Sequence, residues 1–487
     1  MNKQVVIIGA GMGGLTTAAY LAGAGLRVQI FEQHTLPGGY ISSFARDGFT
    51  FPAGPTSFGS NGIVFPILQE LELKGKCRFI RAAHQLSWGE HDIPFHTPRQ
   101  VALDLAKSFP ADRHGLERYF RWVEIGGKGF KDLLESGTMF GRGIVPTMLK
   151  LIVRHPLFPW ASWVARGQTN RSLHARYFQD PFLRQLLNQL GYPVMAGRNT
   201  LGMWITYLYD TWVPAGGMQA FANIFVRFIH EHGGEVHLGE RVKGICIENG
   251  QARGVMLEAG TEILADWVIS AADLHHTCFD LIGWEHLPPI MVSKLGRAHP
   301  SEAVFAVYLG LRGSPELSTA LARFQESHVS FTCTDGQYIQ LVLLSKDDPS
   351  IAPPGKHALY AGMLVPYEDW EPLKHHQAAY LALKAAFVEE IVTRAEEFIP
   401  GLRAYIEVEE AASPLTFERY TNNWRGSTAG WNWYPENAPH FDFAKDLPIK
   451  NFYTVGHYVF NPGGVPTAMI TAWYIAREII KREKSRK

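Results

Sequence analysis

The sequence contains few cysteines and has no excess of charge of either sign. The four cysteines among 487 residues, Cys77, Cys246, Cys278 and Cys333, lie far apart and form no Cys-x-x-Cys pair. This spacing argues against a disulfide framework and a cysteine-ligated metal site, so we expect a reducing compartment and no metal. Lys plus Arg and Asp plus Glu both number 46. A chain without net charge carries no global positive field, and we expect no nucleic-acid partner.

The sequence also lacks a long apolar run, an internal repeat and a low-complexity segment. Residues 140–168 are rich in large apolar side chains with basic residues between them, but Pro146, Pro156 and Pro159 interrupt them. No part of this segment is long enough to cross a bilayer. We expect it either to form buried core or to dock on an anionic membrane surface. The first strand begins near Met1 and leaves no room for a cleaved signal peptide, so we expect a cytoplasmic protein, bound peripherally to a membrane in the second case.

The N-terminal residues form a dinucleotide-binding pattern. An apolar strand is predicted over residues 3–8, a small-residue helix follows to about residue 24, and the next strand ends in Glu32. The turn between strand and helix reads Gly9-Ala10-Gly11-Met12-Gly13-Gly14. In this G-x-G-x-x-G pattern Gly9 permits the tight turn, Gly11 lets the backbone approach a pyrophosphate, and Gly14 lets helix and strand pack closely. The helix N-terminus would bind the phosphates, and Glu32 would bind the ribose.

After Glu32 the chain continues through glycine and proline where a simple nicotinamide dehydrogenase would enter its next helix. Pro37 is followed by Gly38-Gly39-Tyr40, and a short apolar stretch leads to Gly54-Pro55-Thr56. Glycines in such a loop let the backbone contact a flat ring system. The pattern therefore favours FAD over NAD(P) as the dinucleotide.

The C-terminal residues repeat the order of strand, glycine turn and helix. An alternating strand over residues 451–455 leads into Gly456-His457. The run Asn461-Pro462-Gly463-Gly464-Val465-Pro466 then precedes a helix predicted from about residue 467 to 481. Proline suits the first turn of a helix because its missing N–H would have no partner there. The positive end of this helix would stabilise negative charge on a reduced flavin near N1 and O2.

The middle of the chain is predicted to return to the nucleotide-binding sheet. The run Pro214-Ala215-Gly216-Gly217-Met218 precedes an amphipathic helix around residues 221–229. Residues 236–264 are predicted to form a small meander that turns at Asn249-Gly250 and Ala259-Gly260. Residues 267–270 then read as a strand of the central sheet.

Together these motifs resemble those of the FAD-dependent phytoene desaturase, carotenoid isomerase and retinol saturase superfamily, part of the amine-oxidase-like flavoproteins. The resemblance runs from the Gly9–Gly14 motif to the C-terminal Pro-Gly-Gly-Val. It implies an α/β fold with a Rossmann-like FAD-binding domain, discontinuous in sequence, and an inserted α+β substrate domain. The FAD-binding domain would comprise residues 1–70, 213–290 and 442–487, and the substrate-binding domain residues 71–212 and 291–441.

The resemblance also assigns site residues. The implied FAD contacts are Gly9, Gly11, Met12, Gly13, Gly14, Glu32, Gly38, Gly39, Tyr40, Pro55, Thr56, Val242, Gly456, Gly464 and Val465. Tyr40 stands where family members often have arginine, and His457 stands where many have an acid. By motif position both are candidate catalytic groups that tune the flavin or move a proton, and both can equally be packing residues. Trp424, Trp431 and Trp433 would line a substrate tunnel or pack in the core.

The function implied by the resemblance is that of an FAD-dependent, phytoene desaturase-like oxidoreductase. It would desaturate or saturate C–C bonds of a carotenoid-like isoprenoid or another long apolar substrate. Three alternatives stay open: a non-redox flavin isomerase of polyene double bonds, an amine-oxidase-like enzyme, and a lipid-binding escort-type protein. The intact glycine motif with Glu32 argues against the last. We expect non-covalent FAD and no tightly held NAD(P)H, because no second glycine fingerprint follows a strand.

Overall fold

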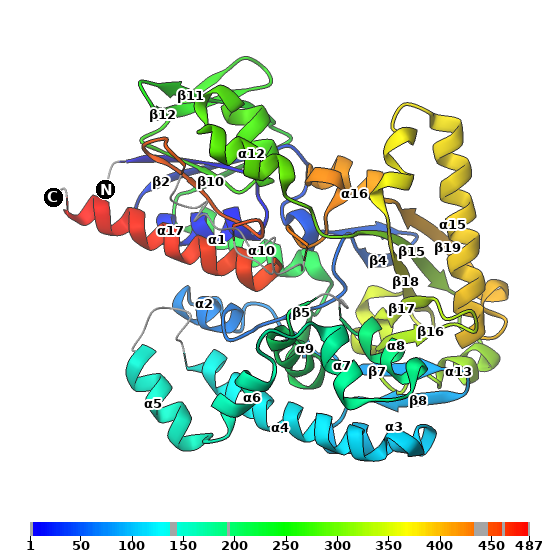
Figure 1. Ribbon diagram of the computed structural model, residues 1–487. Helices are drawn as coiled ribbons and strands as arrows, with labels where there is room; N and C mark the ends of the chain where they lie inside the picture. Colours follow the sequence, from blue (N-terminus) through cyan, green and yellow to red (C-terminus); the bar gives the residue numbers. More distant parts are fainter. Residues whose placement is uncertain (1–2, 137–143, 192–194, 433–446, 460–462, 486–487) are drawn as a thin grey trace.

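Two β-sheets organise the chain in the computed structural model, which describes residues 3–136, 144–191, 195–432, 447–459 and 463–485. One is a five-stranded parallel sheet and the other a seven-stranded mixed sheet (Figure 1). The helices between residues 98 and 209 form a third region that lies along the seven-stranded sheet and below the parallel one in this view.

The parallel sheet is assembled from distant parts of the sequence. Its strand order is β10 (Glu235–Leu238), β2 (Arg27–Glu32), β1 (Gln4–Ile8), β14 (Trp267–Ser270) and β20 (Phe452–Thr454). Every neighbouring pair is parallel. The predicted strands at residues 3–8, 27–32, 267–270 and 451–455 are all present. The expectation that residue 236 begins the meander is wrong, because residues 235–238 pair with β2.

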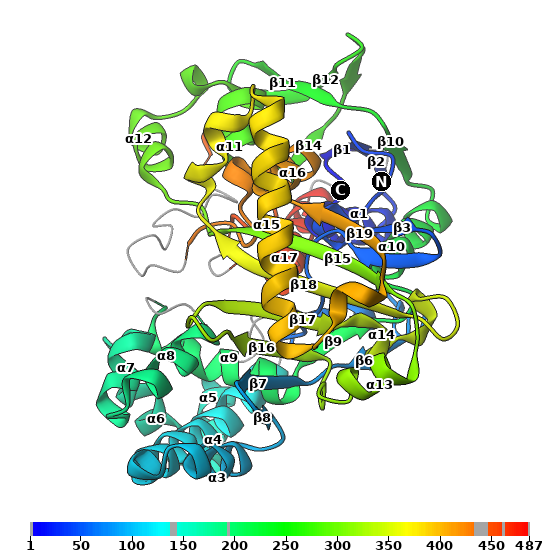
Figure 2. The ribbon, with the colours of Figure 1, turned by 90° about the vertical axis from the view of Figure 1, so that its right-hand side faces the viewer.

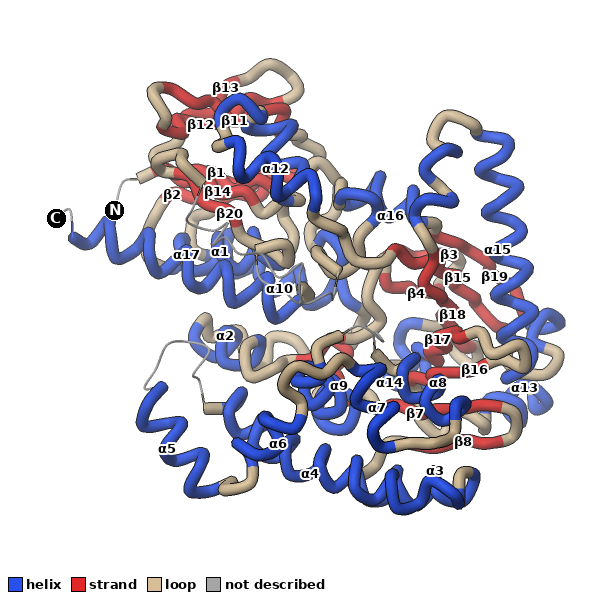
Figure 3. The backbone as a smooth tube through the Cα atoms, in the orientation of Figure 1, coloured by secondary structure: helices blue, strands red, loops and turns tan. Residues whose placement is uncertain are grey.

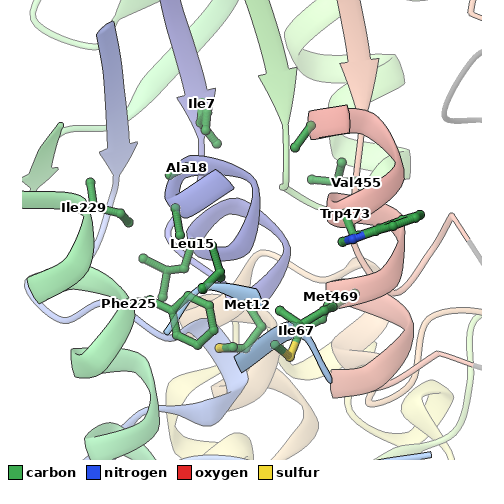
Figure 4. Close-up of a cluster of buried hydrophobic side chains, with 14 of the residues drawn as sticks. Ile7, Met12, Leu15, Ala18, Ile67, Phe225, Ile229, Val455, Met469 and Trp473 are labelled. Carbon is green, nitrogen blue, oxygen red and sulfur yellow. The ribbon is translucent and has the colours of Figure 1, made fainter. Parts of the chain in front are cut away.

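Three helices cover one face of the parallel sheet (Figure 3). They are α1 (Met12–Gly23), α10 (Met218–Glu231) and α17 (Val465–Ser485). Ile7, Leu15, Phe225 and Met469 are fully buried in the core between these helices and the sheet (Figure 4). Fully buried alanines on α1 allow both neighbouring helices to approach it closely. A short helix, α2 (Val64–Glu70), adds Ile67 to the same core.

A three-stranded antiparallel meander covers the other face of the parallel sheet. It consists of β11 (Val242–Glu248), β12 (Gln251–Leu257) and β13 (Glu262–Leu264). Asn249 and Gly250 have φ angles of 51° and 70°, which is the conformation that a two-residue hairpin requires. This confirms the predicted turn. The π-helical turn Thr277–Ile282 and α12 (Pro289–Arg297) pack against the meander.

The seven-stranded sheet combines two separate segments of the chain. Its order is β19 (Ile406–Ala412), β15 (Ala303–Leu311), β18 (His357–Val365), β17 (Tyr338–Leu343), β16 (His328–Thr332), β7 (His84–Trp88) and β8 (His91–Pro94). Neighbours are antiparallel except β16 and β7, which are parallel. The long helix α15 (Gln377–Phe398) crosses one face of this sheet (Figure 2). Ile391 and Phe398 on α15 are fully buried there.

The helical region packs around a core of aromatic side chains. Trp122 donates its indole N–H to the Ala161 carbonyl at 2.9 Å, and Trp204 donates to the Tyr119 hydroxyl at 2.9 Å. In the part of the chain that the structure describes, no helix has the length and apolarity to span a membrane. The helices of this region are α3 (Pro98–Ser108), α4 (Arg113–Glu135), α5 (Ile144–Arg154), α6 (Phe158–Val164), α7 (Asn170–Tyr177), α8 (Pro181–Gln189) and α9 (Gly197–Tyr209).

Short elements lie between the strands and helices described so far. Two of them form a hairpin, three form a small sheet in the order β5-β9-β6, and the others are short helices. These elements are β3 (Ser43–Arg46), β4 (Phe49–Pro52), β5 (Phe58–Gly59), β6 (Phe79–Arg81), β9 (Thr211–Pro214), α11 (Leu274–His276), α13 (Pro315–Leu321), α14 (Leu344–Asp347) and α16 (Pro414–Thr421).

Candidate functional site

A cavity of about 940 Å³ lies between the parallel sheet and the seven-stranded sheet. One side is formed by the start of α1, the loop after β2, the start of β11 and the start of α17. All but one of the predicted cofactor residues line it, although they come from five separate parts of the sequence. They are Gly9, Gly11, Met12, Gly13, Glu32, Gly38, Gly39, Tyr40, Pro55, Thr56, Val242, Gly456, Gly464 and Val465.

The first glycine turn has the geometry that its sequence predicts. Gly9 has a φ of 92° and donates its N–H to the Phe31 carbonyl at 2.8 Å. Gly14 is the predicted cofactor residue that does not line the cavity, because it faces this turn. A Cβ on Gly14 would stand 2.0 Å from the Gly9 carbonyl oxygen, so Gly14 permits helix and strand to pack. A Cβ on Gly11 would meet no atom within 4 Å, so a side chain there would enter the cavity.

The start of α1 offers free backbone donors to the cavity. Gly11 is the N-cap of α1, and no side chain caps the helix there. The first backbone N–H groups of α1 therefore have no capping side chain. Such a helix N-terminus binds anions through its N–H groups and its dipole. The second glycine loop closes over it, since Gly38 donates its N–H to the Ala10 carbonyl at 2.8 Å. A Cβ on Gly39 would stand 3.3 Å from the Gly11 Cα, so glycine at position 39 allows the two loops to approach closely.

Glu32 has a second role that the sequence did not reveal. Its carboxylate accepts the Ala10 N–H at 2.8 Å and the His34 N–H at 2.9 Å, one on each oxygen. The side chain is 8% exposed. Because it bonds to Ala10 in the glycine turn and to His34 in the loop after β2, it holds the turn and this loop together. Each carboxylate oxygen retains a second lone pair, which leaves Glu32 able to accept a ribose hydroxyl in the cavity.

The C-terminal glycines lie beside the N-terminal ones. A Cβ on Gly13 would stand 3.2 Å from the Gly456 Cα, so the two turns are in van der Waals contact. Val465 and Pro466, at the start of α17, line the cavity. The cavity therefore receives the positive ends of two helices, α1 and α17. Asn461 and Pro462 of the predicted motif lie outside the described residues.

Tyr40 and His457 both line this cavity, and their ring centroids lie 6.3 Å apart. The Tyr40 hydroxyl donates to the Ser427 carbonyl at 2.7 Å. Burial raises the pKa of Tyr40 well above its ordinary value, so its hydroxyl stays protonated. Burial lowers the pKa of His457 to about 4, so its imidazole is neutral at physiological pH. Its Nε2 atom lies 3.4 Å from the Asn423 side-chain amide nitrogen.

The opposite wall of the cavity comes from the seven-stranded sheet, and sequence reasoning missed it. Tyr308 of β15, Gln340 of β17, Tyr360 of β18, Ala412 of β19 and Phe417 of α16 contribute this wall. Tyr308 is 1% exposed, and its hydroxyl has no hydrogen-bond partner among the described residues. The first four residues lie on separate strands and Phe417 lies on a helix, so no shared motif marks them and only the tertiary fold brings them together.

The predicted tryptophans lie elsewhere. Trp424 stacks on His275 with centroids 4.3 Å apart. Trp431 is 2% exposed and donates its indole N–H to the Tyr458 carbonyl at 2.8 Å. Neither lines the cavity, and both pack with the core next to the meander, so the geometry favours core packing over a substrate contact. Trp433 lies outside the described residues.

The sequence model of the flavin-containing amine oxidoreductase family matches residues 12–480, and the chain belongs to this family. Its glycine turns, the two helix N-termini and Glu32 fit a flavin dinucleotide, and the protein is an FAD-dependent oxidoreductase.

Two relatives and one solved structure illustrate the likeness. The chain is 26% identical to 4,4'-diapophytoene desaturase of a Methylomonas species over 100% of this chain and 96% of the relative. It is also 26% identical to the chloroplastic prolycopene isomerase of Daucus carota, over 86% of this chain and 70% of the relative. An oxidoreductase from Methanosarcina mazei superposes with a TM-score of 0.64 at 19% identity and covers 97% of this chain and 100% of its own. This last likeness shows the fold.

Proposed function

We propose that this protein is an FAD-dependent desaturase of a long isoprenoid polyene. The observation that carries the proposal is the composition of the 940 Å³ cavity, which joins a wall of glycine turns and helix N-termini to a wall that carries several aromatic side chains. The rings of Tyr308, Tyr360 and Phe417 offer flat apolar faces that suit a long polyene, beside the hydroxyls of the two tyrosines and the amide of Gln340. The two relatives compared above are named for a diapophytoene and a prolycopene.

The bound cofactor would supply a two-electron acceptor for a hydride. The chain would supply the orientation and the electrostatics. The start of α17 directs its positive end into the cavity and would favour an anionic ring there. In the same proposal, residues 71–212 and 291–441 act as the substrate-binding domain. The pairing of β7 with β16 supports this assignment, because it joins the two segments into one sheet.

Tyr40 and His457 would have different roles in this site. The Tyr40 hydroxyl is committed to the Ser427 carbonyl, which makes Tyr40 a positioning residue for the 423–427 loop. His457 is neutral and faces the cavity, so it can accept a hydrogen bond or a proton there. We assign it as the group that contacts the reacting part of the ligand.

The surface of α5 and α6 would bring the enzyme to its apolar substrate. We name as the α5–α6 patch the exposed apolar side chains Val145, Leu149, Ile152, Val153, Leu157, Trp160 and Trp163. Val145, Val153 and Trp163 are 71%, 83% and 67% exposed, whereas Leu151 and Phe158 on the same helices are buried. The expectation of buried core therefore holds for one face of these helices only.

The charged residues around the α5–α6 patch support an anionic membrane as its occupant. Lys150, Arg154 and Arg166 are exposed around it, and anionic lipid complements apolar and basic side chains together. We propose peripheral docking on an anionic membrane through this patch. Figure 1 shows α5 at the edge of the molecule, away from both sheets.

The test of the enzymatic proposal is a single-turnover assay. FAD-loaded protein is mixed under anaerobic conditions with anionic liposomes that contain 4,4'-diapophytoene, phytoene or prolycopene, and the products are analysed by mass and by retention time. Loss of two hydrogens from a polyene with the oxidised enzyme supports the proposal. Gain of two hydrogens with the prereduced enzyme would show that the enzyme is a saturase. Unchanged mass with altered double-bond geometry would support the isomerase. Oxidation of a primary amine, tested in parallel, overturns the proposal in favour of amine oxidase chemistry.

A further inference from the structure

A second group of titratable side chains lies beside the cavity and plays no part in the cofactor contacts. His84 on β7 and His328 on β16 face each other in the register of the two parallel strands, and their ring centroids lie 5.0 Å apart. They are 6% and 1% exposed. Buried histidines are costly unless their ring nitrogens have partners, so the partners show what the pair is built for.

His328 connects the cavity to the protein surface through a short series of polar groups. Its Nε2 atom lies 3.4 Å from the hydroxyl of Thr56, which lines the cavity. Its Nδ1 atom lies 2.9 Å from the hydroxyl of Ser327, and Ser327 hydrogen bonds to the Asp347 carboxyl. The Asp347 carboxyl is also 3.9 Å from Nδ1 and its side chain is 13% exposed, next to the exposed Lys346.

A small cavity accompanies this series. It measures about 20 Å³ and is lined by Thr56, His328 and Asp347 among others. That volume admits one water molecule. Thr56 lines both this small cavity and the large one, so it stands at the boundary between them.

His84 is hydrogen bonded outside the series of polar groups that contains His328. The Thr211 hydroxyl donates to the Thr206 carbonyl at 2.8 Å, so His84 Nε2, 2.9 Å away, must donate its proton to Thr211. Burial and the neighbouring His328 ring lower the pKa of His84, which keeps it neutral. His84 therefore packs against the His328 ring and, being neutral, does not take up a proton from it.

The charges around His328 favour a proton at the outer end of the series. Burial lowers the pKa of His328 to about 4. Burial raises the pKa of Asp347 to about 6, with Glu326 adding to the rise and Lys346 opposing it. A carboxyl that titrates near neutral pH exchanges protons readily with solvent.

We propose that Thr56, His328, Ser327 and Asp347 form a proton route between the large cavity and solvent. This inference rests on the proposed function. Desaturation removes two hydrogens from adjacent carbons, one with both electrons of its bond as a hydride and the other as a proton. The hydride goes to the cofactor, and the proton must leave an apolar cavity.

The route moves one proton through its members in turn. The Thr56 hydroxyl takes up the proton and gives its own to His328 Nε2. His328 releases its Nδ1 proton to Ser327, and the Ser327 hydroxyl proton passes to Asp347. One transfer leaves His328 protonated at Nε2 instead of Nδ1 and leaves Asp347 protonated, so Asp347 then releases its proton to solvent and the His328 tautomer is restored before the next transfer in the same direction. Uptake of one proton from solvent follows the same steps in reverse, starts from His328 protonated at Nε2, and returns His328 to the form protonated at Nδ1.

The test uses the FAD-loaded protein and needs no polyene. Dithionite supplies two electrons and is oxidised to sulfite, while one proton from solvent has to reach the cavity. Bleaching of the flavin absorbance is followed by stopped flow at pH 7 in H₂O and in D₂O. We expect Asp347→Asn to bleach between about ten and a hundred times more slowly, with a larger solvent isotope effect. Formate should restore the rate of Asp347→Asn in proportion to its concentration, because it can replace a missing surface carboxyl.

The matched control is Asp369→Asn, which makes the same substitution at an exposed carboxylate outside the series, and it should bleach as the wild type does. His328→Asn should be slow and should not respond to formate. If His328→Asn fails to fold, Asp347→Asn at the surface still decides the question. Wild-type bleaching and isotope effect in Asp347→Asn, or slow bleaching that formate does not restore, would overturn the route. Because dithionite provides the electrons, failure of the polyene assay leaves this test unaffected.

Discussion

Gly13 and Gly456 lie against each other at the junction of two glycine turns, and a Cβ on Gly13 would stand 3.2 Å from the Gly456 Cα. The contact closes the parallel sheet from both ends of the chain, because Gly13 opens α1 and Gly456 follows β20. It also sets the starts of α1 and α17 on the same cavity. The cofactor site therefore forms only when the C-terminal strand has joined the sheet.

Two glycines of the first turn should respond differently to the same substitution. Gly11→Val should fold normally but lose FAD, since the new side chain enters the cavity where the dinucleotide binds. Gly14→Val should lower the melting temperature as well, because its Cβ would collide with the Gly9 carbonyl. The measurement is flavin absorbance of the purified protein together with its thermal unfolding by circular dichroism. A Gly11→Val protein that keeps FAD would contradict the assigned binding mode.

Glu32 is expected to support FAD binding in two ways. Glu32→Gln replaces one acceptor oxygen with an NH₂ group that faces the N–H of Ala10 or His34. FAD should bind more weakly by roughly 1–3 kcal/mol, measured by fluorescence titration of the apoprotein. Glu235→Gln on the edge strand β10 is the control, because its carboxylate is exposed and does not line the cavity. Equal affinity in wild type and Glu32→Gln would remove Glu32 from the site.

The sequence predicted the cofactor wall of the site well and the substrate wall poorly. Gly9, Gly11 and Glu32 are constrained by local turn geometry and by the close approach that a dinucleotide would need, so their spacing carries the signal. Tyr308 and Tyr360 have no such spacing, because they meet across β15 and β18. Trp431 was one of the candidate substrate contacts, but it is buried in the core. A tryptophan in a core and one in a substrate tunnel have the same kind of apolar neighbours in the sequence, so the sequence does not distinguish them. The pairing of residues 235–238 with β2 depends on long-range contacts that a local strand pattern does not encode.

Acid should destabilise the fold through buried neutral histidines such as His174. Trp204 donates to the Tyr119 hydroxyl, so Tyr119 donates to His174 Nε2, and the Nδ1 proton goes to Asn188 at 2.8 Å. Burial lowers the pKa of His174 to about 4, below the value near 6.5 of an unfolded chain. Its contribution to stability is therefore present above pH 6.5 and is lost as the pH falls toward 4.

The measurement is the free energy of unfolding in urea at pH 7.5 and pH 5.0. His174 alone should account for about 2 kcal/mol of the decrease between these two values. His174→Gln should therefore be less stable than wild type at pH 7.5 but lose less stability on acidification. A decrease of the same size in both proteins would show that His174 already titrates normally in the folded state.

The α5–α6 patch should bind anionic membranes, and Trp160 and Trp163 should carry much of the affinity. Both indoles are exposed, at 47% and 67%, and tryptophan favours the membrane interface. Wild-type protein should float with phosphatidylglycerol liposomes at low salt, less at high salt, and little with neutral liposomes, because salt screens the attraction between basic side chains and lipid. The double variant Trp160→Gln with Trp163→Gln should stay at the bottom of the gradient.

The matched control for this prediction is Trp284→Gln. Trp284 is 66% exposed but lies beside α12, away from the α5–α6 patch, so its loss should leave flotation unchanged. The folded state of each variant is checked by its bound flavin. Self-association through the α5–α6 patch is the competing outcome, and light scattering without lipid distinguishes it. A dimer that the double variant converts to a monomer, with no flotation in either protein, would assign the patch to a second copy of the chain and exclude the membrane.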